Sequence, residues 1–157
     1  MQELTIRQAS GDDVIWAATL MAASEPWITL GRGYEACYQA CTSSPDVLEV
    51  AETDGRRCGF VLVRPAGVAG APYIKSIAVA PDQRSLGVGA ALLAHVERTF
   101  RGRSRHLFLC VSSFNGRARQ FYERQGYSAV GTFKDFIIDG ADEILMYKRL
   151  PAPDASA

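Results

Sequence analysis

The feature that most constrains the fold of this sequence is a glycine-containing loop between an apolar segment and an amphipathic one. Residues 73–80, YIKSIAVA, are mostly apolar and predict a strand, and apolar residues recur at helical spacing from Gly87 to Phe100. Gly87 and Gly89 lie at the start of that helix, with Arg84 just upstream. A helix N-terminus carries unpaired N–H groups and a positive dipole end, and glycine allows close approach of a ligand. The segment therefore predicts a strand–loop–helix unit that binds a phosphate group.

Two well-known phosphate-binding loops do not fit this segment. The nucleotide P-loop ends in Gly-Lys-Ser/Thr, whereas Gly89 is followed by Ala90 and Ala91. The dinucleotide fingerprint needs a third glycine and an acidic residue beyond the next strand. Position 92 is leucine, and the strand predicted at 106–112 does not end in an acid. A nucleotide-dependent enzyme of the kinase type is therefore disfavoured.

The order of the remaining segments predicts an α/β fold with a mixed central sheet. The expected strands cover 4–9, 47–53, 57–64, 73–80, 106–112, 128–136 and 143–150, and the expected helices 14–24, 34–43, 87–100 and 116–125, with loops at 25–33 and 64–72. This amounts to about seven strands and about four helices. Asp54-Gly55 predicts a hairpin, whereas the helix between strands 73–80 and 106–112 predicts a parallel pair.

Length and charge limit the remaining classes of function. We expect one domain over residues 1–150 and a disordered tail over 151–157. Seventeen basic residues balance seventeen acidic ones, which argues against a broad nucleic-acid surface. We see no signal peptide and no membrane span, and four cysteines without a metal-binding pattern, so we expect a cytoplasmic protein without a metal.

A second block lies downstream, FNGRARQFYERQGY at residues 114–127. Together with SIAVAP and Arg84-Ser-Leu-Gly87-Val-Gly89, it resembles the motifs of the GNAT superfamily of acetyl-CoA-dependent N-acetyltransferases. The resemblance covers roughly residues 3–150, and its specific motifs lie in 73–127. It implies a sheet that splays between its fourth and fifth strands. It also implies acetyl-CoA as co-substrate and transfer of acetyl to a primary amine by direct attack in a ternary complex.

The resemblance also implies roles for particular residues. Loop N–H groups would bind the CoA diphosphate, Ile77 and Val79 would pair with the pantetheine arm, and an amide of Ile77 or Ala78 would stabilise the oxyanion. Tyr122 would donate a proton to the departing thiolate, and Asn115 would contact the cofactor arm, cap a helix, or do both. The implied cofactor-binding residues are Ile77, Ala78, Val79, Arg84, Ser85, Gly87, Val88, Gly89, Ala90, Asn115 and Tyr122.

The acceptor side is less defined by sequence. Trp27, Tyr34, Glu35 and Tyr73 are the candidate substrate residues, although Trp27 and Tyr34 fit packing over the sheet edge equally well. The turn carrying Asp139, Asp142 and Glu143 either attracts a cationic amine or is simply solvated. The acceptor could be a small molecule, a peptide or a protein.

Several alternatives stay open at this point. Relatives often carry a glutamate near the end of the fourth strand, but this strand has no acid, so the base could be Glu25, Glu35 or water held by Tyr73 or Ser112. Cys110 fits either a covalent route or the core. A binding module that senses acyl-CoA without turnover is the alternative to an enzyme. The oligomeric state stays open, and a homodimer is compatible with the sequence.

Overall fold

The computed structural model describes residues 3–152, and its helices and strands follow the predicted chain order. Most of the tail expected to be disordered, 151–157, lies outside the described residues. The strands are β1 (Leu4–Gln8), β2 (Val47–Thr53), β3 (Arg56–Val68), β4 (Ala71–Val79), β5 (His106–Ser112), β6 (Ser128–Phe133) and β7 (Glu143–Arg149). The helices are α1 (Gly11–Ala22), α2 (Tyr34–Thr42), α3 (Val88–Phe100) and α4 (Gly116–Arg124), with a short 3-10 turn η1 (Pro81–Gln83).

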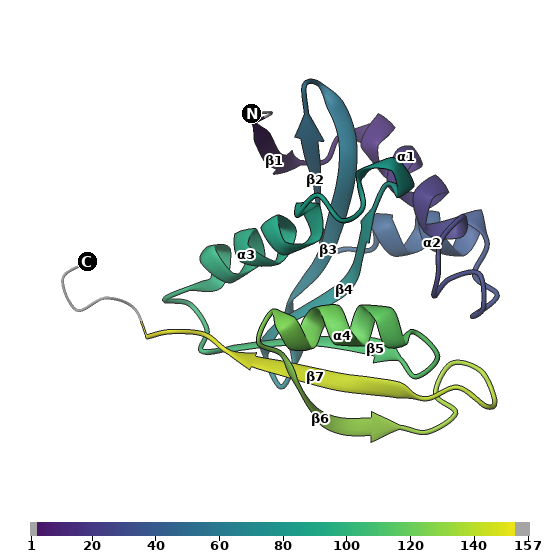
Figure 1. The fold of residues 1–157 in the computed structure, drawn as a ribbon, viewed down its shortest axis with the longest axis vertical. Helices are drawn as coiled ribbons and strands as arrows, with labels where there is room; N and C mark the ends of the chain where they lie inside the picture. Colours follow the sequence, from purple (N-terminus) through teal and green to yellow (C-terminus); the bar gives the residue numbers. More distant parts are fainter. Residues whose placement is uncertain (1–2, 153–157) are drawn as a thin grey trace.

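The strands form one seven-stranded sheet in the order β1-β2-β3-β4-β5-β7-β6. All neighbours pair antiparallel except β4 and β5, which are parallel, as the crossover through α3 predicts. In Figure 1, strands β2 to β4 run up the page, whereas β5, β7 and β6 run across it. The sheet therefore changes direction between β4 and β5.

Strand β3 is buried on both faces, which explains its unbroken apolar run Cys58–Val63. Phe60 and Leu62 pack with α1 and α2 on one face of the sheet. Val61 and Val63 pack on the other face, in the core that α3 and α4 share with β5 and β7. The helices thus form two layers, α1 and α2 against one face and α3 and α4 against the other (Figure 1).

The segment 64–72, expected to be a loop, is mostly strand. Strands β3 and β4 continue to a two-residue turn at Ala69 and Gly70, whose φ angles are +49° and +80°. Two successive positive φ angles are typical of the type I′ turn that closes tight hairpins. The prediction missed this because Pro65 and Gly67 suggested a break, and a bulge between Arg64 and Val68 accommodates them instead.

Pairing between β4 and β5 is confined to one end of the two strands. Only Tyr73–Phe108 and Ile74–Leu109 are paired, and beyond Ile74 the strands separate. We call this opening between Lys75–Val79 of β4 and Cys110–Ser112 of β5 the splay. It confirms the predicted separation of the fourth and fifth strands.

Candidate active site

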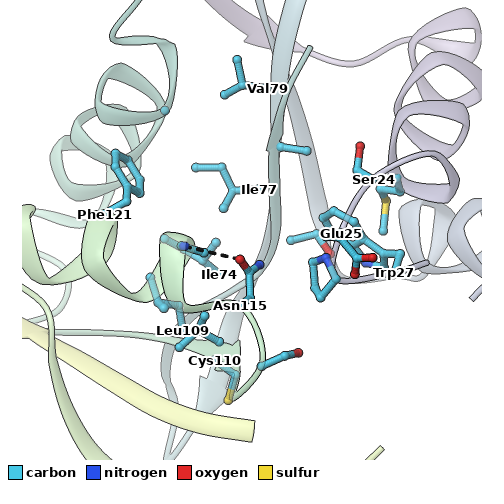
Figure 2. Close-up of a pocket in the computed structure, with 18 of the residues that line it drawn as sticks. Ser24, Glu25, Trp27, Ile74, Ile77, Val79, Leu109, Cys110, Asn115 and Phe121 are labelled. Atoms are coloured by element: carbon cyan, nitrogen blue, oxygen red, sulfur yellow. Dashed lines mark hydrogen bonds between the residues drawn. The ribbon is translucent and has the colours of Figure 1, made fainter. Parts of the chain in front are cut away.

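A cleft of about 970 Å³ passes through the splay. In Figure 2, Phe121 of α4 lies on one side of the β4 residues Ile77 and Val79, while Glu25 and Trp27 of the α1–α2 segment lie on the other. The lining includes all the cofactor-binding residues expected from sequence: Ile77, Ala78, Val79, Arg84, Ser85, Gly87, Val88, Gly89, Ala90, Asn115 and Tyr122. The fold thus brings both sequence blocks to one cavity.

Backbone groups of β4 face the splay at alternate residues. The Ala80 N–H donates to the Cys58 carbonyl at 2.8 Å, so it points toward β3. Because peptide groups alternate sides along a strand, the Ala78 groups also point toward β3, and those of Ile77 and Val79 point into the splay. Of the two amides considered for an oxyanion, the Ile77 amide is therefore the one that faces the cleft.

The loop between β4 and α3 turns sharply before the helix begins. Ser85 and Gly87 have φ angles of +66° and +84°, and Gly87 is the N-cap of α3. The first backbone amide that makes a helical hydrogen bond is that of Ala91, which donates to the Gly87 carbonyl at 3.0 Å. Helix geometry leaves the preceding amides at Val88, Gly89 and Ala90 without such acceptors. All three residues line the cleft, and N–H groups of this kind suit an anionic oxygen.

Gly89 also has a packing role that the sequence did not reveal. A Cβ placed on Gly89 would lie 3.1 Å from the Cζ atom of Phe121, closer than nearly all real contacts of this kind. The absent side chain therefore lets α3 and α4 approach each other at the cleft. Asn115 begins α4, and its Oδ1 accepts a long hydrogen bond of 3.4 Å from the Ala118 amide. Asn115 is thus both a helix cap and a cleft residue.

Tyr122 lies in the wall of the cleft formed by α4. It is 8% exposed, and its ring centroid lies 5.4 Å from that of Phe121 and 6.3 Å from that of Tyr127. Burial raises the pKa of its phenol, so the hydroxyl stays protonated across the physiological range. It can therefore donate a proton or a hydrogen bond to a group in the cleft.

The candidate acceptor residues divide into two pairs. Trp27 and Tyr73 line the cleft, and Trp27 also packs in the core beneath α1 and α2. Tyr34 and Glu35, at the start of α2, are not among the lining residues; Tyr34 instead contacts Tyr38, with ring centroids 6.0 Å apart. Trp27 thus both packs over the sheet and faces the cavity.

Glu143 is a cleft residue whose position the sequence did not indicate. Among the acids of the last turn, Glu143 lines the cleft but Asp139 and Asp142 do not. It is the first residue of β7, directly opposite Ser112 of β5, whose hydroxyl donates to its Oε2 at 2.6 Å. The residue is only 8% exposed, and burial raises the pKa of its carboxyl. The sequence places Glu143 beside a turn, but it does not reveal that β7 pairs with β5, and this pairing is what buries Glu143.

Cys110 lies beside Tyr73 at the splay. Burial raises the pKa of its thiol, although the hydrogen bond from Tyr73 partly opposes this. A raised pKa lowers the fraction of thiolate, the form that attacks carbonyl carbon. Within residues 3–152, no three His, Cys, Asp or Glu side chains cluster as metal ligands, and no helix is long and apolar enough to cross a membrane.

Comparisons with known proteins find relatives that belong to one family of acetyltransferases. The sequence model of the Acetyltransferase (GNAT) family matches residues 14–127. The chain is 37% identical over 109 residues to an uncharacterized N-acetyltransferase of Methanocaldococcus jannaschii, covering 68% of this chain and 69% of that protein.

Solved structures show the same fold. A protein of Desulfovibrio desulfuricans assigned to the GNAT family aligns with a TM-score of 0.79 and 23% identity, over 95% of this chain and 100% of that one. A Bacillus anthracis structure described as a streptothricin acetyltransferase, in complex with acetyl coenzyme A, aligns with a TM-score of 0.63 and 22% identity, over 70% of this chain and 65% of that one. With its glycine loop, its splay and a family match over residues 14–127, the chain belongs to the Acetyltransferase (GNAT) family.

Proposed function

We propose that this protein is an N-acetyltransferase that moves an acetyl group from acetyl-CoA to a primary amine by direct attack in a ternary complex. The observation that carries the proposal is the course of the cleft. It joins the glycine loop and α4 on one face of the sheet to the α1–α2 segment on the other, through the splay. Two substrates can therefore enter from opposite faces and meet at β4.

The residues of the first face suit acetyl-CoA. The amides at Val88, Gly89 and Ala90, with Arg84 beside them, fit a diphosphate. The peptide groups of Ile77 and Val79 face the splay and can bond the amides of an extended arm as a neighbouring strand would. The cleft, at about 970 Å³, is large enough for an elongated ligand and an acceptor.

The chemistry needs few groups from the protein. Bound acetyl-CoA supplies an activated thioester carbonyl. The Ile77 amide, aimed into the splay, is positioned to stabilise negative charge on the carbonyl oxygen. Tyr122 holds its proton because its phenol is buried, and it can give a hydrogen bond to sulfur as negative charge develops there. Cys110 is not needed as a nucleophile in this scheme, consistent with the raised pKa of its thiol.

The test is release of free CoA thiol from acetyl-CoA across a panel of small primary amines, amino acids and peptides. We expect acceptor-dependent thiol release and a product heavier by one acetyl group by mass spectrometry. Tight binding of acetyl-CoA without turnover on any acceptor would overturn the proposal and favour an acyl-CoA sensor.

A further inference from the structure

Alternation along β5 and β7 places three side chains, Cys110, Ser112 and Glu143, on one face of the sheet, and Tyr73 of β4 joins them there. Leu109, Val111, Ile144 and Met146 belong to the core that includes Tyr122 of α4. The alternate residues Cys110, Ser112 and Glu143 must therefore point to the opposite face, and Tyr73 shares it because it pairs with Phe108. Over strands β2 and β3, that same face is the one covered by α1 and α2. Tyr122 thus contacts the cleft from the cofactor side, and Glu143 from the acceptor side.

Glu143 is the only buried carboxylate among the described residues that line the cleft. The other lining carboxylate, Glu25, is exposed and accepts a hydrogen bond from the Thr29 hydroxyl at 2.8 Å. Among residues 3–152, the one hydrogen bond to Glu143 comes from Ser112 and engages Oε2, which leaves Oε1 available to an incoming donor. Arg32 of the α1–α2 segment, Tyr73 of β4 and Cys110 of β5 are the charged and titratable groups that face this carboxylate.

We propose that Glu143 is the general base of the acetyl transfer, and that Ser112 is the positioning residue that holds its carboxylate toward the acceptor. This inference rests on the proposed function and deepens it. It assigns the base to β7, a strand where the sequence did not place one.

The chemistry balances with this one base. An acceptor amine with a pKa of about 10 enters as an ammonium ion and gives one proton to Oε1 of Glu143. The amine nitrogen then forms a bond to the acetyl carbon, the carbon–sulfur bond breaks, and sulfur keeps the electron pair. The second proton leaves the nitrogen as the amide forms, and sulfur takes up one proton by way of Tyr122. One proton in total is released to solvent, and nothing is oxidised or reduced.

The surroundings of Glu143 suit this role. Burial raises the pKa of its carboxyl, whereas the Ser112 hydrogen bond and the Arg32 charge partly oppose the rise. A base whose pKa lies nearer neutrality accepts a proton from an ammonium ion with a smaller free-energy cost. The carboxylate form is the active one, so turnover should fall as the pH drops through its pKa.

The experiment compares Glu143→Gln with the wild-type protein on two matched acceptors. One is the best aliphatic amine of the panel, and the other is its β,β,β-trifluorinated counterpart, whose three fluorines lower the amine pKa enough to leave it largely uncharged at neutral pH. We expect Glu143→Gln to lower kcat/KM roughly 10²-fold or more on the basic amine and much less on the fluorinated one. A purely structural role for Glu143 would lower both rates alike. Ser112→Ala should show the same selectivity with a smaller loss.

Three controls separate the possible outcomes. Acetyl-CoA binding and the melting temperature should be unchanged in Glu143→Gln, and Glu123→Gln, on the exposed part of α4, should keep full activity. The assignment would be overturned if Glu143→Gln lost activity equally on both amines or lost none. It would also be overturned if Glu25→Gln, and not Glu143→Gln, lost activity selectively on the basic amine. If Glu143→Gln fails to fold, Ser112→Ala decides by the same comparison. Absence of turnover in the wild-type protein would instead overturn the proposed function itself.

Discussion

Among single residues, Gly89 combines two requirements, because it contributes an amide to the cleft and allows α3 to lie against Phe121 of α4. Gly89→Ala would bring a Cβ to 3.1 Å from Phe121, so we expect the free energy of unfolding to fall by about 1–3 kcal/mol. Urea denaturation measures this. The matched control is Gly116→Ala, where no atom lies within 4 Å, and stability should be unchanged or slightly raised. Equal stabilities of the two variants would contradict the packing role.

Tyr122 offers a second prediction for a single side chain. Tyr122→Phe removes only the hydroxyl, so kcat should fall by roughly 10²-fold while acetyl-CoA binding is retained, as measured by steady-state kinetics and calorimetry. Tyr127→Phe is the control, since the Tyr127 hydroxyl is buried without a hydrogen-bond partner among the described residues. That variant should keep its activity and be at least as stable as the parent. Full activity in Tyr122→Phe would remove the proton-donor role.

Among the elements, the loop between β4 and α3 is the one that we propose binds the diphosphate of acetyl-CoA. Arg84 donates through Nε to the Val79 carbonyl at 3.1 Å, which anchors its side chain at the end of β4. Ser85 and Leu86 follow and carry no charge, so the loop amides and Arg84 are the groups that attract a diphosphate here.

Arg84→Ala should therefore weaken acetyl-CoA binding about tenfold, the loss of one charge-assisted hydrogen bond. Because exposed charges are screened by salt, wild-type affinity should fall between low and high ionic strength, and less steeply in the variant. Calorimetry at two salt concentrations measures both effects, with Arg98→Ala on the exposed end of α3 as the control. Wild-type affinity that does not change with salt would count against this account.

At the scale of the whole molecule, Asp13 connects three elements. Its side chain is fully buried and forms ion pairs with Arg7 of β1 at 2.6 Å and Arg57 of β3 at 2.6 Å, while it also accepts from the Ser10 amide at the start of α1. The hydrogen bond from Arg7 is the main cause that holds the pKa of this carboxyl well below its usual value. The charged carboxylate is therefore part of what holds α1 against the sheet.

The pH dependence of stability follows from the sign of that shift. Because the folded pKa lies below the unfolded one, the stabilisation is fully present above about pH 4 and is lost as the pH falls toward the folded pKa. Asp13→Asn should lower the free energy of unfolding at pH 7 by about 3 kcal/mol, and its stability should change less between pH 5 and pH 2. Asp12→Asn, exposed in the same helical turn, is the control for both measurements. Parallel pH profiles for Asp13→Asn and the parent would contradict this explanation.

Local sequence patterns were enough to predict most of the helices and strands and the glycine loop on one side of the cleft. The alternating and helical periodicities predicted the order of strands and helices, because burying an apolar face is a local demand on the sequence. The glycine loop predicted an anion site, because N–H groups at a helix start depend on neighbouring residues alone. The roles expected for Asn115 and Tyr122 came from the family resemblance instead. Where local cues conflicted, as at Pro65 and Gly67, the strand was missed, since its continuation depends on pairing with β4.

The sequence by itself therefore determined the α/β class, the strand–loop–helix unit and the polar groups that it presents. Only the tertiary structure decided which side chains reach the acceptor face of the splay. Glu143 is buried because β7 pairs with β5, although helix α4 and strand β6 separate the two strands along the chain. Strand register sets which face each side chain takes, and register arises from long-range pairing that no local pattern encodes.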